Sequence, residues 1–348
     1  MHCRTLTERN TNLNGRTIVR NIMFGSPEGP WNHSFRLEHK LGPRLKVDPD
    51  TPRAERALSK KRDTFVLSAY KDTRVCRTLR EFAQVCTPTE KPRAVIVGEG
   101  KDAEVQLMEL FPGTPLFVEK PVATGPIGDV GQVYEVSRPI EDTNTVCSVG
   151  YMLRYLKGVQ VMKKIIEDNN LTVVATIARY TCAYEAIAKP DWWDKSKSFG
   201  PIIEQGTHFC DLSRYFGGEV DLTSVQAHSL EWDEENGRLG KMAVDESEIA
   251  PENRIPRVTS AAWKYESGAV GTFTHVLALQ GTDYSCELEV YADGYQFKLV
   301  NPYVSPVLYI RQPGQETESK MAFPEDDPFF SEISCFTIRL RTRLRALG

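Results

Sequence analysis

Short apolar runs that alternate with helical stretches over the first 150 residues constrain the fold of this chain more than any other feature of its sequence. A short apolar run between turn signals is typical of a strand that is buried on both faces. Strands that alternate with helices pair in parallel, and helices cover both faces of their sheet. The sequence therefore predicts an α/β domain with a doubly wound parallel sheet over residues 15–150, with strands at 17–24, 45–47, 94–98, 116–118 and 145–150.

One of these strands ends in a charged pair followed by proline. Leu116-Phe117-Val118 runs directly into Glu119-Lys120-Pro121, and proline ends strand pairing because it has no N–H to donate. Glu119 and Lys120 are therefore expected at the carboxyl edge of the sheet, where open α/β sheets bind ligands. We expect a nicotinamide ring beside Lys120. A Lys–Glu pair that caps a loop is an equally good interpretation of these three residues alone.

The segment after the first strand stands where a dinucleotide fold has its phosphate-binding loop. A G-x-G-x-x-G pattern that begins at Gly25 would have its second and third glycines at Pro27 and Pro30. Neither proline has an N–H to offer a pyrophosphate. Gly25 and Gly29 remain as candidate cofactor-binding residues, and an ordinary Pro/Gly turn explains the segment about as well.

An acidic residue follows the second strand at the spacing expected of a dinucleotide site. Asp48 stands about 20 residues after the glycine loop, where a carboxylate binds the ribose hydroxyls of the adenosine. The same carboxylate repels a 2′-phosphate, so Asp48 favours NAD over NADP, although Arg53 nearby weakens that preference. Gly98, at the end of its strand, is a further candidate for contact with the cofactor.

After residue 150 the pattern changes to one helix followed by alternating strands. The strand pairs on either side of Gly268 and Gly294 read as hairpins, because each is joined by a short glycine-containing loop. Such a sheet packs one face on helices and leaves the other open, and we expect self-association through the open face. Residues 233–256 form a polar insertion that we expect to be mobile. The predicted strands are 172–183, 222–232, 258–265, 269–279, 287–291 and 295–300.

One helical segment within this second region carries titratable side chains. Glu204, His208, Asp211 and Tyr215 are spaced at i, i+4, i+7 and i+11, so they share one helix face. A carboxylate near a histidine fixes its tautomer and raises its pKa, which suits His208 to general acid/base chemistry. A structural histidine is the second interpretation. A metal site formed by Glu204, His208 and Asp211 is the third, weakened because no other cluster of ligands supports it.

An aromatic and acidic patch precedes this helix. Asp191-Trp192-Trp193-Asp194 offers ring faces that pack on the C–H surface of a sugar and carboxylates that bind hydroxyls. Trp193 is therefore a candidate substrate-binding residue. A packed loop between a strand and the helix is the alternative interpretation.

Composition excludes several classes of protein. The net charge of −4 gives no global affinity for nucleic acid or an anionic membrane, and no window approaches the roughly 18 apolar residues of a membrane span. The eight cysteines are scattered without C-x-x-C spacing, so we expect neither a zinc ribbon nor a dithiol redox site, and our overall prediction is a chain without a metal. Scattered thiols without a hydrophobic signal core predict a reducing, cytoplasmic location.

Taken in order, these motifs resemble the glucose–fructose oxidoreductase/inositol dehydrogenase (Gfo/Idh/MocA) family. The resemblance covers about residues 94–300 and rests on Glu119-Lys120-Pro121, on Gly150-Tyr151-x-x-Arg154-Tyr155 and on the helix from Gly200 to Tyr215. It implies a Rossmann domain, an α/β domain with an open, mainly antiparallel sheet, and hydride transfer between NAD(P) and a hydroxyl carbon of a sugar, polyol or cyclic diol.

The resemblance also implies roles for individual residues. Lys120 would contact the substrate hydroxyl and the nicotinamide ribose, His208 would take the hydroxyl proton, and Glu204 would act as the acid four residues before it. Tyr151, Arg154 and Asp211 would line the substrate side. A non-catalytic protein that senses a dinucleotide or sugar on the same fold is the alternative, motivated by the prolines in the glycine loop.

The end of the chain departs from this pattern. Residues 327–336 read as the start of a closing helix, but arginines alternate with other residues from 339 to 345 and no acid balances them. We therefore expect a Rossmann domain over 15–150, a substrate domain over 151–336 and a basic tail over 337–348.

Overall fold

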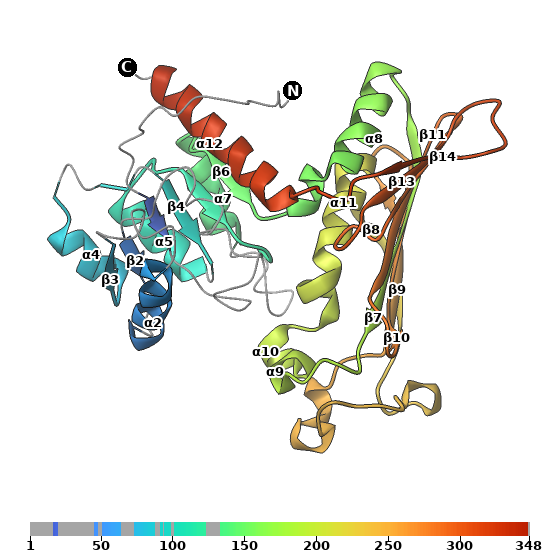
Figure 1. The fold of residues 1–348 in the computed structure, drawn as a ribbon, viewed down its shortest axis with the longest axis horizontal. Helices are drawn as coiled ribbons and strands as arrows, with labels where there is room; N and C mark the ends of the chain where they lie inside the picture. The colour runs from blue at the N-terminus through green and yellow to red at the C-terminus, as the bar shows by residue number, and fades with distance from the viewer. Residues whose placement is uncertain are drawn as a thin grey trace. The chain divides into compact units, whose positions relative to one another are not determined.

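The computed structural model describes residues 17–19, 45–47, 51–63, 73–87, 91–92, 94–98, 101–122 and 133–346 of this 348-residue chain. These residues form two compact units, each built around its own sheet (Figure 1). The first unit comprises the described residues up to Gly150 together with those from Phe329 onward, and the second comprises Tyr151 to Pro328.

The first unit has a six-stranded sheet in which every strand pair is parallel. The strand order β3-β2-β1-β4-β5-β6 reverses direction after β1, which is the order of dinucleotide-binding sheets. The predicted parallel sheet is confirmed, while β3 was not predicted because only three residues form it and no apolar run marks them. The strands are β1 (Thr17–Val19), β2 (Leu45–Val47), β3 (Arg74–Cys76), β4 (Ala94–Val97), β5 (Leu116–Val118) and β6 (Cys147–Val149).

Strands β4 and β5 are buried on both faces of the sheet. Neighbouring residues along a strand point to opposite faces, so their side chains fill two separate layers. On one face Val95, Val97 and Leu116 pack against Phe82 and Leu107. Val118 and Leu79 complete this layer. The helices of the unit up to Gly150 are α2 (Thr51–Arg62), α4 (Leu79–Val85), α5 (Lys101–Leu110) and α7 (Val133–Asp142).

The last helix, α12 (Pro328–Ala346), packs on the opposite face of the parallel sheet. Its Ile333, Phe336 and Leu340 form one cluster with Ala94, Ile96 and Phe117, and the rings of Phe117 and Phe336 lie 5.6 Å apart in an edge-to-face contact. The expectation of a basic tail from residue 337 was wrong, since the segment is helical to Ala346. The three apolar residues follow the spacing i, i+3 and i+7, which gives a helix one buried stripe despite its arginines.

The second unit has an eight-stranded sheet in the order β14-β13-β12-β11-β7-β10-β9-β8. The pair β7–β10 is parallel and the other pairs are antiparallel, which confirms the predicted, mainly antiparallel architecture and both hairpins. The strands are β7 (Val173–Ala183), β8 (Val220–Leu230), β9 (Val258–Tyr265), β10 (Val270–Leu279), β11 (Ser285–Ala292), β12 (Tyr295–Val300), β13 (Val307–Arg311) and β14 (Ser319–Ala322).

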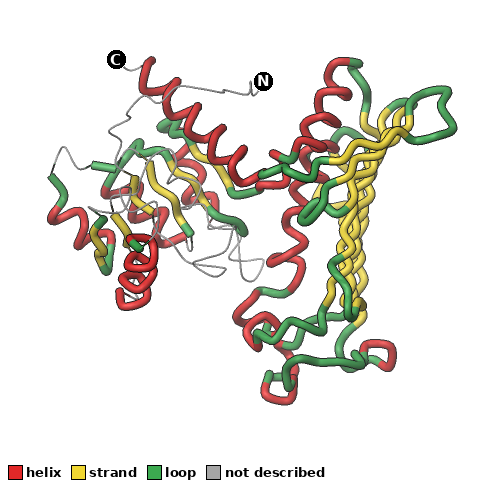
Figure 2. The backbone as a smooth tube through the Cα atoms, viewed as in Figure 1, coloured by secondary structure: helices red, strands yellow, loops and turns green. Residues whose placement is uncertain are grey.

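The two longer helices of this unit, α8 (Lys157–Asp168) and α11 (Thr207–Gly217), lie along one face of the sheet (Figure 2). The burial of β10 follows this arrangement, because Phe273, His275 and Leu277 are buried while the residues between them are partly exposed. The other face carries polar pairs such as Arg179–Glu287, whose charged atoms are 3.0 Å apart. The helix α9 (Pro190–Trp193) and the helix α10 (Lys195–Ser198) precede α11.

The polar insertion at 233–256 is packed against the unit rather than loosely attached, in contrast to the mobile loop that we expected. Ile249 and Ile255 are buried within it. Just after it, the buried guanidinium of Arg257 binds the Glu246 carboxylate at 2.5 and 3.0 Å. The insertion contains the short helical turns Glu235–Gly237, Glu246–Glu248 and Pro251–Asn253. No helix in the described part of the chain is long and apolar enough to span a bilayer.

Candidate active site

The carboxyl edge of the parallel sheet holds Glu119 and Lys120, as the sequence predicts. Val118 ends β5, and the Glu119 N–H then donates to the Val97 carbonyl at 2.8 Å. Glu119 lies over the end of β6, because a Cβ added to Gly150 would stand 2.7 Å from Glu119 Oε2. Glycine at position 150 is therefore what allows the carboxylate to occupy this place. Both Glu119 and Lys120 are partly exposed.

This edge fits a dinucleotide cofactor. The sheet reverses its strand order between β1 and β4, and open α/β sheets bind ligands at the carboxyl ends of the strands where such a reversal occurs. Gly98 directly follows β4 there and is partly exposed, so its backbone is open to a close approach. Gly98, Glu119 and Lys120 are the predicted cofactor residues that the structure describes. Gly25, Gly29 and Asp48 lie outside the described residues.

In the second unit, the segment before α11 is a π-helical turn, Ile202–Gly206, rather than the regular α-helix that the spacing predicts. Gly206 is needed for this turn, since a Cβ at that position would stand 2.8 Å from Phe273 Cε1. The Gln205 side chain ties the turn to β10 through a 2.8 Å hydrogen bond between its Oε1 and Nε2 of His275. Such turns occur frequently at functional sites. This one contains Glu204 and leads directly into α11, the helix of His208.

His208 lies near the start of α11 and is 8% exposed. Two tyrosine rings stand edge-on to its imidazole, Tyr151 at 6.2 Å and Tyr303 at 6.1 Å between ring centroids. The hydroxyls of Tyr151 and Thr207 share a 3.2 Å hydrogen bond. Burial raises the pKa of Tyr151, so its hydroxyl stays protonated at neutral pH and serves as a hydrogen-bonding group. The structure thus places predicted Tyr151 directly beside predicted His208.

Tyr303 is a residue of this site that the sequence did not reveal. It belongs to the turn after β12, and 95 positions separate it from His208 along the chain. Its ring also contacts Tyr180 and Phe209. A tyrosine in an Asn-Pro turn gives no local signal of such a distant contact.

Arg154 and Asp211, both predicted to bind substrate, bind each other. Arg154 donates from Nε to Oδ2 of Asp211 at 2.7 Å and from Nη2 to Oδ1 at 2.5 Å. The Asp211 side chain is 4% exposed and that of Arg154 is 37% exposed. Burial raises the pKa of the Asp211 carboxyl, and the hydrogen bonds from Arg154 oppose that rise. Asp211 therefore positions Arg154, and only Arg154 of this pair reaches solvent to any extent.

Trp193 does not have the role that we predicted for it. Its side chain is fully buried and its indole N–H donates to the Ile187 carbonyl at 3.0 Å. The ring packs edge-on against Tyr184 and Trp192. Because the ring has no exposed face and its one polar group is satisfied, Trp193 is a core residue of the second unit.

The second unit has another buried histidine, and its chemistry differs from what the site requires. His275 is 1% exposed and stacks on Tyr180 with 5.1 Å between ring centroids. Burial lowers its pKa to about 4, so it is neutral at physiological pH and serves as a structural hydrogen-bonding group. His208 is therefore the histidine of this helix–sheet layer that remains a candidate for proton transfer.

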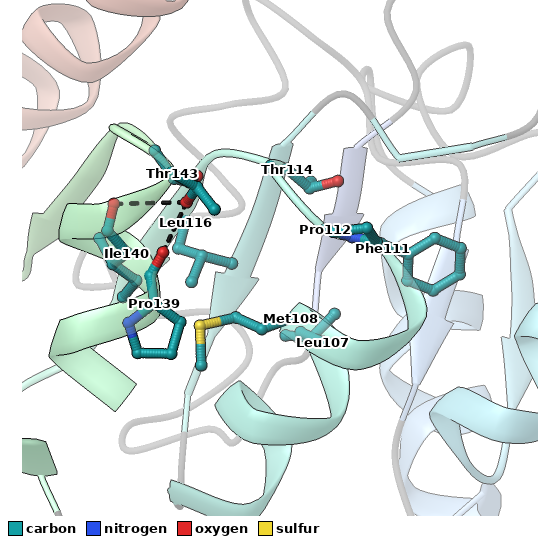
Figure 3. Close-up of a pocket in the computed structure, with 11 residues that line it drawn as sticks. Leu107, Met108, Phe111, Pro112, Thr114, Leu116, Pro139, Ile140 and Thr143 are labelled. Carbon is teal, nitrogen blue, oxygen red and sulfur yellow. Dashed lines mark hydrogen bonds between the residues drawn. The ribbon is translucent and has the colours of Figure 1, made fainter. Parts of the chain in front are cut away.

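A shallow hollow of about 60 Å³ lies at the opposite end of β5 from Lys120 (Figure 3). Leu107, Met108 and Leu116 line it with Pro139, and the nearby Thr143 hydroxyl donates to the Pro139 carbonyl at 2.6 Å. Leu116 is the first residue of β5, so the hollow belongs to the amino edge of the strands. Its lining is mainly apolar and carries no titratable group, so it is not part of the candidate site. Within the described residues, no group of three or more His, Cys, Asp or Glu side chains could hold a metal ion.

Comparison with known proteins places the chain among relatives from fission yeast. It is 45% identical over 331 residues to the Schizosaccharomyces pombe protein UNK4.17, and the match covers 90% of this chain and 80% of that protein. It is 43% identical over 332 residues to protein C12C2.04 of the same yeast, with 90% and 85% covered. Both relatives are named only as uncharacterized proteins. Residues 154–295 match the family model described as "Putative oxidoreductase C terminal domain".

Solved structures share the fold at low sequence identity. A UDP-N-acetylglucosamine 3-dehydrogenase from Acidithiobacillus ferrooxidans aligns with a TM-score of 0.67 and 13% identity, covering 94% of this chain and 89% of that one. A levoglucosan dehydrogenase in complex with NADH and levoglucosan aligns with a TM-score of 0.67 and 14% identity, covering 92% and 88%. These likenesses establish the fold of the chain.

Proposed function

The chain belongs to the same family as the two Schizosaccharomyces pombe proteins, an oxidoreductase family by its matched C-terminal domain, and we propose that it is an NAD(P)-dependent dehydrogenase of sugar-like alcohols. The observation that carries this proposal is the histidine site of the second unit. His208 is held between two tyrosine rings, on a helix that also carries a buried carboxylate bound to Arg154. Glu119 and Lys120, at the carboxyl edge of the parallel sheet, supply the cofactor side.

Each residue of the site has a separate role in the proposed oxidation. A nicotinamide held beside Glu119 and Lys120 would supply the acceptor for the hydride of the carbinol carbon. His208 accepts the hydroxyl proton, and the positive charge of Lys120 stabilises the negative charge that develops on the oxygen. Glu204, four residues before His208, supports the charge that His208 gains. Tyr151 donates a hydrogen bond on the substrate side, since its hydroxyl is protonated.

The cofactor is proposed from the sheet edge and from the sequence. Gly98, Glu119 and Lys120 would hold it at the carboxyl ends of β4 and β5, together with Gly25 and Gly29 of the glycine loop. Asp48 would bind the ribose hydroxyls of the adenosine and repel a 2′-phosphate, so we propose NAD as the preferred cofactor. A hydroxyl carbon of a sugar, polyol or cyclic diol is the proposed site of oxidation.

The first experiment is a fluorescence titration of the purified chain with NADH and, separately, with NADPH. Tighter binding of NADH supports the proposal as stated. Binding of NADPH alone keeps the class of enzyme and removes Asp48 from the site. Binding of neither would overturn the proposal.

Activity then tests the two catalytic residues on a panel of polyols and cyclic diols. We expect His208→Asn to lower kcat by about 10²–10⁴-fold, as expected for loss of a general base, and Lys120→Met to abolish turnover. His228→Asn is the matched control, because His228 is exposed on β8 and distant in sequence from the site. Retained turnover in Lys120→Met would exclude Lys120 from the mechanism.

A further inference from the structure

We propose that Arg154 recognises a negatively charged substituent of the substrate, a carboxylate or a phosphate, carried on the same sugar-like ring as the reacting hydroxyl. This inference rests on the proposed function and narrows its substrate class. Three features of Arg154 support it: the contacts that fix its guanidinium, the donors that are left available, and its connection to the helix of His208.

The guanidinium of Arg154 is fixed on two sides. Its Nε and Nη2 are bound to the buried carboxylate of Asp211, and its Cζ lies 5.0 Å from the centroid of the Tyr215 ring. A planar guanidinium held along one edge and supported on one face is preorganised. It therefore loses little conformational freedom when it binds a further partner.

The opposite edge of the guanidinium is available for a ligand. Among the residues that the structure describes, none accepts a hydrogen bond from Arg154 Nη1, and 37% of the side chain is exposed. Two parallel N–H donors on one edge match the geometry of a carboxylate or a phosphate. A neutral hydroxyl uses such an edge less well, because it offers a single oxygen without charge.

A second cation stands on the same aromatic ring. Nζ of Lys163 lies 5.1 Å from the Tyr215 centroid, and the lysine side chain is 30% exposed. The carboxylate paired with Lys163 is that of Glu167 at 3.9 Å, which is 55% exposed and thus weakly coupled. Arg154 and Lys163 each have a carboxylate partner, and both remain partly exposed on the Tyr215 ring, so an anion at this ring would meet two cations.

The spacing along α11 connects this anion site to the reacting atoms. Asp211, which holds Arg154, follows His208 by three residues on the same helix. At a rise of 1.5 Å per residue the two positions are about 4.5 Å apart along the axis, and residues three apart share one helix face. The carboxylate that holds Arg154 therefore starts from the same face of α11 as His208, one turn further along the helix.

The test uses the full chain and three probes that share a ring: glucose, glucuronate and glucose 6-phosphate. The readout is the Arg154 Nε–H resonance in NMR spectra, which is observable because that proton is bound to buried Asp211. We expect at least one of the two anions to shift this resonance saturably and to bind about tenfold to a hundredfold more tightly than glucose, the range for a charge-assisted hydrogen bond. The two anions distinguish a carboxylate substrate from a phosphate substrate.

Variants separate recognition from structural support. Arg154→Gln combined with Asp211→Asn removes both charges together, so no buried carboxylate is left unpaired. This variant has no Arg154 resonance, so its binding is measured by titration calorimetry alongside that of the parent, and we expect it to bind glucose and the anions equally. Arg214→Met is the matched control, because Arg214 is an exposed arginine of α11, the helix of Asp211, and is paired with Glu219. This variant should keep the preference for anions.

Three outcomes overturn the inference: glucose binds as tightly as both anions, none of the probes moves the Arg154 resonance, or the double variant keeps the preference. NADH binding, measured on the same sample, reports on the proposed function separately. A chain that binds NADH but shows no preference for anions would refute the substrate class and leave the dehydrogenase proposal standing.

Discussion

The two sheets of this protein use their side chains in different ways. The parallel sheet has strands of three or four residues, and its central strands β4 and β5 are apolar on both faces. The larger sheet has strands of up to 11 residues, and polar groups such as Thr176 and His275 are buried on its helix-covered face. The candidate polar side chains of the first sheet therefore lie where its strands end, whereas those of the second lie within the layer between helix and sheet.

This difference explains where the candidate residues lie. Glu119 and Lys120 follow directly after a strand, because every position inside β5 is needed for packing. His208 lies on a helix above the second sheet, where Gln205 and His275 link the two layers through a hydrogen bond. The lesson is that the parallel sheet supplies a rigid edge, while the antiparallel sheet supplies a supporting surface for the helix that carries the histidine.

The largest effect is expected in the parallel sheet. Phe117→Ala removes a fully buried ring that packs on Phe336, and we expect a loss of about 4 kcal/mol in the free energy of unfolding, typical of buried phenylalanine. Hydrogen exchange measured by mass spectrometry should show faster exchange in β4 and β5 and unchanged exchange in β7 and β10. Val85→Ala, at an exposed position of the same unit, is the control. Equal acceleration in both sheets would contradict the separation into two cores.

A somewhat smaller effect is expected from overpacking the second sheet. A Cβ added at Gly271 would stand 2.2 Å from Trp263 Nε1 and 2.7 Å from the Tyr265 hydroxyl oxygen, so Gly271→Ala should lower the free energy of unfolding by about 3 kcal/mol, at the upper end for overpacked cores. Tryptophan fluorescence during urea unfolding measures it, since Trp263 is at the site. Gly240→Ala, where the nearest atom is 3.7 Å away, should change little. A Gly271→Ala protein as stable as the parent would show that this layer can relax.

The smallest of the three effects depends on pH. Because burial lowers the pKa of His275 to about 4, against about 6.5 in the unfolded chain, the unfolded state binds the proton more readily between these values. Stability should therefore fall as the pH is lowered through this window, and His275 should account for about 2 kcal/mol between pH 7 and pH 5.

Urea unfolding of the parent and of His275→Asn at both pH values isolates this contribution. The variant should be less stable than the parent at pH 7 and should lose less stability on acidification. His228→Asn should behave like the parent, because His228 is exposed. The same pH dependence in His275→Asn as in the parent would assign the acid sensitivity to other groups.

What the sequence predicted correctly depended on local signals. The apolar run before Glu119 marked β5, and the hairpins at Gly268 and Gly294 followed from glycines that adopt positive φ values of 90° and 82°. The face shared by His208 and Asp211 followed from helical spacing. Each of these features is determined by a few consecutive residues, so one sequence is enough to find it.

What the sequence missed depended on contacts between distant residues. The pairing of Arg154 with Asp211 joins residues 57 positions apart, and it converts a predicted substrate ligand into a positioning group. The prediction for Trp193 failed because its contacts could not be read from the sequence. It is buried through contacts with Tyr184 and Ile187, and no local pattern connects these residues to it. The apolar stripe of α12 was missed because two patterns overlap in its sequence. Its arginines recur at every second position, while its apolar residues follow helical spacing.

The helix α12 has a consequence for the order in which the protein is made. The residues that cover Ala94, Ile96 and Phe117 lie between Ile333 and Leu340. They follow the whole second unit, which ends at Pro328. On the ribosome, one face of the first sheet therefore stays without this cover until the whole second unit has been synthesised. We expect the second unit to complete its fold before the first, and the first unit to depend on chaperones until α12 has been synthesised.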